Sequence, residues 1–74
     1  MKYTVCEIRE SSFSGKSGYD VFWQKQRIYN SQDDLYFVTE VILNYMAEQG
    51  WKFEQMVQEK NLSKSLLIFS KVER

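Results

Sequence analysis

The sequence predicts a small α+β fold in which one α-helix packs on one face of a small antiparallel β-sheet, in the order strand–strand–helix–strand–strand. Three observations lead to this prediction: the chain is short, an amphipathic stripe lies near its middle, and strand-forming segments flank that stripe on both sides. A length of 74 residues allows a single domain over 1–74. A hydrophobic content of 43% is enough for a core and argues against global disorder.

The first strand is expected over residues 2–9, because most of this segment consists of good strand formers. Residues 10–17 are rich in Ser and contain Gly15, which favours a loop. A second strand is expected at about residues 19–28, where apolar side chains alternate with others. Both faces of this second strand hold apolar groups, as in a strand near the middle of a sheet or at an interface.

The central helix has the strongest pattern. Ser31 is expected to be its N-cap, with Asp33 and Asp34 in the first turn, where acidic side chains suit the positive end of the helix dipole. The stripe runs to about Gln49, and Gly50 stands where a left-handed C-terminal cap is needed. The residues that recur at three- and four-residue spacing are Leu35, Val38, Val41, Ile42, Tyr45 and Met46.

Two strands are expected after the helix, at about residues 51–58 and 64–72, joined by a polar turn. One helix covers only one face of such a sheet. The chain also holds more large rings than a short helix can bury, namely Phe13, Tyr19, Trp23, Trp51, Phe53 and Phe69. We therefore expect the second sheet face to form a homo-oligomer, most simply a dimer, since small proteins usually hide apolar patches in this way.

Four segments resemble domain of unknown function family 4177, a family of short uncharacterised bacterial and phage proteins. They are residues 1–8, 13–16, 43–53 and 67–71. The passage from the helix through Gly50 and Trp51 into a strand is the most specific of them. The resemblance implies a small sheet-plus-helix fold and supplies no catalytic residue or cofactor. The chain departs from the family at residues 17–30, which insert an extra strand, and at Ala47, where a Gly is common.

Residue usage excludes several classes of site. The chain has no His and a single Cys, which excludes a His-based triad, a structural zinc site and an intrachain disulfide. Cys6 is expected to be a small buried hydrophobe. The run from Gly15 to Ser17 resembles the end of a phosphate-binding loop, but Glu10 stands where that motif requires Gly. We expect no enzyme activity, no cofactor and no metal.

The candidate binding residues lie in the second predicted strand. Tyr19, Trp23, Lys25 and Arg27 share one face if that strand is continuous. We expect this face to contact a second copy of the chain or a protein partner. Binding of single-stranded nucleic acid is the alternative, because rings can stack on bases while cations meet phosphates. The zero net charge and the pI near 6.2 argue against a strongly basic clamp.

A third hypothesis concerns the helix, which carries acidic residues and no Lys or Arg. The acidic residues are Asp33, Asp34, Glu40 and Glu48. Such a surface suits a basic site on a partner, as in phage-encoded inhibitors of host proteins. The N-terminus lacks a signal-peptide pattern, and the most apolar stretch, 35–47, is too short for a membrane span. A cytoplasmic location without membrane association is therefore expected.

Overall fold

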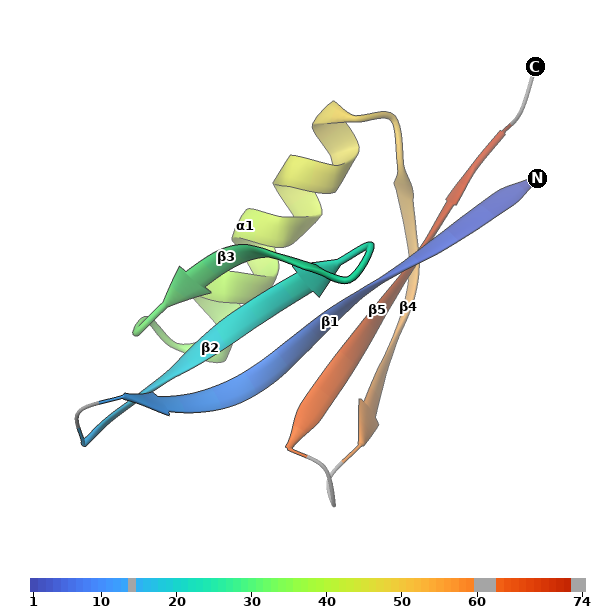
Figure 1. Ribbon diagram of the computed structural model, residues 1–74. Coiled ribbons are helices and arrows are strands. Elements are labelled where there is room, and N and C mark those ends of the chain that lie inside the picture. Colours follow the sequence, from blue (N-terminus) through green and yellow to red (C-terminus); the bar gives the residue numbers. More distant parts are fainter. Residues whose placement is uncertain (14, 60–62, 73–74) are drawn as a thin grey trace.

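The computed structural model describes residues 1–13, 15–59 and 63–72, and the side chain of Phe13 lies outside this description. Within these residues the chain forms one helix and a five-stranded antiparallel sheet (Figure 1). In chain order the elements are β1 (Lys2–Phe13), β2 (Lys16–Trp23), β3 (Gln26–Ser31), α1 (Leu35–Glu48), β4 (Lys52–Glu59) and β5 (Lys64–Lys71). The spatial order of the strands is β3-β2-β1-β5-β4. The predicted fold class, one helix packed on a small antiparallel sheet, is confirmed.

The predicted strand count and order are wrong, because the segment expected to be one strand over 19–28 forms two. The chain reverses at Gln24 and Lys25, which adopt positive φ angles of 53° and 64°, and β3 returns antiparallel to β2. Two consecutive left-handed residues are characteristic of a tight hairpin turn. The observed order is therefore strand–strand–strand–helix–strand–strand.

The first strand is also longer than predicted. The Ser-rich segment expected to be a loop pairs with β2, where Ser11 lies opposite Gly18 and Ser12 opposite Ser17. Gly15, with φ of 78°, lies in the short connection between β1 and β2. The connection at Gly15 is therefore much shorter than the loop predicted over residues 10–17.

Both ends of α1 are fixed by local hydrogen bonds. Its N-cap is Asp34 rather than Ser31, because the Asp34 side chain accepts a hydrogen bond of 2.8 Å from the backbone N–H of Phe37. At the other end, Gly50 has φ of 86°, and the Trp51 N–H donates to the Met46 carbonyl at 3.0 Å. The predicted left-handed cap at Gly50 is confirmed.

The core lies between α1 and one sheet face, referred to below as the helix face. The helix contributes a buried row, and β1, β2 and β5 contribute the side chains that it covers. These core residues are Cys6, Ile8, Val21, Val38, Ile42, Met46, Leu67 and Phe69, each at most 1% exposed. Burial of Cys6 confirms the prediction made for it. Figure 1 places the helix on this side only, and no described element covers the opposite side, the open face.

Candidate functional site

The four predicted binding residues do not share a face. Tyr19 pairs with Glu10, and Trp23 with the buried Cys6, so both rings project on the helix face. Lys25 occupies the turn between β2 and β3. Arg27 lies opposite Phe22, on the open face. The prediction of one continuous aromatic and basic row is wrong, because it assumed that the strand did not turn at residues 24 and 25.

The Trp23 side chain is fixed on the helix face by contacts with β1 and α1. Its indole N–H donates to the hydroxyl of Thr4 at 2.8 Å. Its ring packs edge-on against Tyr45 of the helix, with ring centroids 6.4 Å apart and planes at 86°. This ring therefore joins β1, β2 and α1. In this arrangement the Trp23 ring faces the helix and not the open side of the sheet.

The open face instead carries its own apolar row, on strands that lie side by side in the sheet. Val5 on β1 is opposite Ile68 on β5, and Leu66 of β5 is opposite Val57 on the edge strand β4. The members are Tyr3, Val5, Phe22, Val57, Leu66 and Ile68. Tyr3 is 63% exposed, Val5 44% and Val57 36%, whereas the other three are half-buried.

Sequence reasoning did not single out this row, although a signal was present. In β5 the four consecutive residues Leu66 to Phe69 are all apolar. Because successive side chains of a strand point to opposite faces, such a run places apolar groups on both sides of the sheet. One helix covers only one of those sides.

Charged groups lie beside the apolar row on the same face. Glu7 forms ion pairs with Arg9 at 2.9 Å and with Lys64 at 3.3 Å. The Arg9 guanidinium, and less strongly the Lys64 ammonium, lowers the pKa of the Glu7 carboxyl. Arg9 also lies over the ring of Phe22, 4.8 Å from its centroid. The open face therefore presents both signs of charge next to an apolar surface.

Both edges of the sheet are irregular. In the pairing of β2 with β3 the register shifts between Val21 and Phe22, which leaves Ile28 as an extra residue. In the pairing of β4 with β5 it shifts between Phe53 and Gln55, which leaves Glu54 extra. Bulges on edge strands hinder the addition of a further strand. The face is thus better suited to a partner than the edges.

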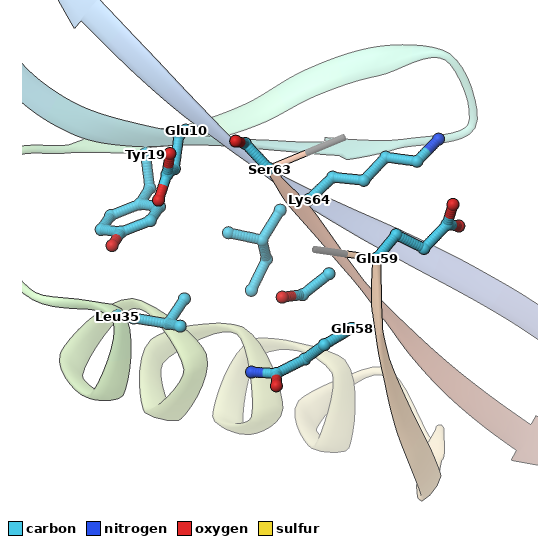
Figure 2. A pocket seen from close by; sticks show the side chains of 9 residues that line it. Glu10, Tyr19, Leu35, Gln58, Glu59, Ser63 and Lys64 are labelled. Atoms are coloured by element: carbon cyan, nitrogen blue, oxygen red, sulfur yellow. The ribbon is translucent and has the colours of Figure 1, made fainter. Parts of the chain in front are cut away.

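A pocket of about 250 Å³ opens on the helix face, near the start of α1 (Figure 2). Ile8, the Tyr19 ring and Leu35 supply apolar walls, and Glu10 and Gln58 supply polar groups. Figure 2 shows Glu59 and Lys64 at the border of this pocket, with side chains that extend away from Tyr19 and Leu35. The backbone N–H of Glu10 donates to the Ser63 carbonyl at 3.1 Å, which ties β1 to the residue preceding β5.

The outer surface of α1 combines aromatic and acidic side chains. Tyr36 is 89% exposed and Phe37 47% exposed. Glu40 lies one turn from Tyr36 on this surface and is also exposed. No Lys or Arg occurs between Leu35 and Glu48. Sequence reasoning found the acidic character of the helix but not its exposed rings, since Tyr and Phe are more often buried.

The remaining chemistry is limited. Cys6 is fully buried, and burial raises the pKa of its thiol to about 11, which leaves very little thiolate at neutral pH. Among the described residues, no three His, Cys, Asp or Glu side chains gather in a way that could hold a metal ion. The single helix of the described ranges lacks the length and apolar character needed to cross a membrane.

Comparisons with protein-family models, with curated proteins and with solved structures returned no match for this chain. The resemblance to family 4177 therefore stays a prediction based on the four segments described above.

Proposed function

We propose that this chain is a small non-catalytic interaction module that self-associates through the open face of its sheet and engages a protein partner. The observation that carries the proposal is the uncovered apolar row formed by Tyr3, Val5, Phe22, Val57, Leu66 and Ile68. Contiguous apolar surface of this kind on a small protein marks an interaction site.

A second copy of the chain suits this face for reasons of charge. The cations Arg9 and Lys64 and the anion Glu7 lie on one face. In a two-fold symmetric contact the same patch occurs on both partners, so cations of one copy can approach carboxylates of the other. The formal net charge of the chain is zero, so long-range repulsion between copies is small.

The open face is also large enough for a contact between two copies of the chain. Five strands at about 4.8 Å spacing span roughly 19 Å, and eight residues at about 3.3 Å extend over roughly 26 Å. The projected area is therefore about 500 Å². An area of this size is below the roughly 800 Å² per partner of a standard interface and suits a weak, concentration-dependent dimer.

Sedimentation velocity over a range of protein concentrations tests self-association directly. We expect the mass to rise with concentration from 8.9 kDa towards twice that value. A mass that stays at 8.9 kDa at every concentration would remove the self-association part of the proposal.

The aromatic and acidic outer surface of α1 supports a second candidate, a contact with a basic protein surface. Exposed Tyr36 and Phe37 supply apolar anchors, and Glu40 supplies charge complementary to a cationic site. This is the inhibitor-like alternative suggested by the sequence. The test compares the partners captured by the wild type, by Glu40→Lys and by the matched control Glu59→Lys. The candidate requires a partner with a basic surface that Glu40→Lys loses and Glu59→Lys retains.

Binding of single-stranded nucleic acid stays a prediction with less support than the other two. It relied on Tyr19 and Trp23 lying beside Lys25 and Arg27 on one open strand. The two rings instead lie on the helix face, apart from Arg27. Saturable, salt-sensitive binding of an oligonucleotide would nevertheless restore it.

A further inference from the structure

We propose that the pocket between the start of α1 and the sheet binds a small organic ammonium ion. The pocket lies on the helix face, so this site is separate from the open face of the proposed dimer. Its volume of about 250 Å³ is below the range of roughly 300–1,000 Å³ found for drug-sized ligands. The occupant is therefore a small molecule.

The walls of the pocket favour an apolar body. Ile8 is 1% exposed and belongs to the core, and Leu35 and Tyr19 pack against that core. Figure 2 shows the Tyr19 ring and the Leu35 side chain on adjoining sides of the same space. An aliphatic chain or an aromatic ring placed there would exchange water contact for contact with these groups.

The charge of the pocket favours a cation. Glu10 pairs with Tyr19 across β1 and β2, which places its carboxylate on the helix face beside the ring. Within the described ranges, no hydrogen bond or ion pair engages this carboxylate. Among the described residues that line the pocket, the one cationic residue is Lys64, whose ammonium binds Glu7 on the opposite face. Within this described lining, the Glu10 carboxylate therefore has no cationic partner.

These groups together match an ammonium ion with an apolar substituent. The carboxylate of Glu10 can accept a charge-assisted hydrogen bond from the ammonium, and the face of Tyr19 can add a cation–π contact. The amide of Gln58, which Figure 2 shows on the far side of the space, offers a further acceptor. A carboxylate ligand would meet Glu10 with the same sign of charge and is disfavoured.

Nuclear magnetic resonance titrations with three matched probes test the proposal. 2-Phenylethylamine is protonated at neutral pH, 2-phenylethanol is its neutral counterpart, and phenylacetate is an anion. We expect saturable shifts at the amides of Ile8, Glu10, Tyr19 and Leu35. The amine should bind about fivefold more tightly than the alcohol, the factor for a charge-assisted over a neutral hydrogen bond, and phenylacetate should bind weakest.

Two variants separate the pocket from a general charge effect. Glu10→Gln should make the amine and the alcohol bind about equally tightly. The amine loses its charge-assisted hydrogen bond, whereas the alcohol keeps its neutral contacts. Glu48→Gln makes the same change of charge at an exposed position at the other end of α1, outside the pocket lining, and should leave the preference intact. Equal binding of amine and alcohol, equal effects of the two variants, shifts confined to other residues, or no saturation by the amine would each overturn the proposal.

Discussion

Replacement of Val5 by Glu is the sharpest test of the open face as a dimer interface. Val5 lies on β1, the central strand of the sheet, and its side chain is 44% exposed opposite Ile68. A residue at the centre of a two-fold contact lies close to its own copy. Val5→Glu would therefore bring two carboxylates together in a desolvated interface.

The magnitude follows from the exposed area of Val5. An exposure of 44% corresponds to roughly 65 Å² of apolar surface, worth about 1.6 kcal/mol at roughly 25 cal/mol per Å². Two copies per dimer give about 3 kcal/mol, or about a 150-fold increase in the dimer dissociation constant. This figure applies to a contact that buries the exposed part of Val5 completely, and repulsion and desolvation of the introduced carboxylates act in the same direction.

Sedimentation equilibrium of the wild type and the variant supplies the assay. Tyr36→Glu is the matched control, because it adds the same charge to an 89% exposed position on the helix. A urea titration of each protein establishes that both variants fold. The reasoning fails if Val5→Glu leaves the dissociation constant unchanged, or if Tyr36→Glu raises it equally.

Four further predictions concern the turn, the core, the thiol and nucleic acid. Combining Gln24→Asn with Lys25→Gly should raise the unfolding free energy by about 1 kcal/mol, because φ angles of 53° and 64° suit Asn and Gly; an unchanged urea midpoint would contradict this. Ile42→Val deletes a methyl group at a 1% exposed site and should lower the unfolding free energy by about 1 kcal/mol in the same assay. Burial raises the pKa of Cys6 from 9.0 to about 11. Because the folded-state pKa is the higher one, this contribution to stability is complete below pH 9.0 and is lost as the pH rises towards about 11, by up to about 1.4 kcal/mol per pH unit. Unfolding free energies measured across this pH range should decline, and a thiol reagent should modify the native protein far more slowly than the unfolded one. Fluorescence of Trp23 should not respond to a single-stranded oligonucleotide; saturable quenching that weakens with salt would contradict that expectation.

Sequence reasoning located the elements whose patterns are local. The helix stripe predicted the buried residues Val38, Ile42 and Met46, and Gly50 ended the helix as expected. The turn at Gln24 and Lys25 was missed, because Gln and Lys rarely adopt the positive φ angles that Gly, Asn and Asp adopt in turns. A run of four long polar residues, 24–27, interrupts the apolar alternation and was the available sign of that turn.

The missed turn also explains the error in the candidate site. Side-chain parity is counted along a continuous strand, and a reversal resets it. The Trp23 side chain therefore lies on the helix face, whereas Arg27 lies on the open face. The pocket beside Glu10 was beyond sequence reasoning altogether, since it depends on β1, β2, α1 and β4 meeting in space.

The central place of β1 has a consequence for synthesis of the chain. Val5 and Ile68 are register partners but lie 63 residues apart in sequence (68 minus 5). At roughly 5–20 residues per second, a ribosome needs about 3–13 s to supply the second partner after the first. During that interval one edge of β1 has no strand beside it, and another nascent chain could supply one. Slower translation between β1 and β5 should therefore increase domain-swapped or aggregated product.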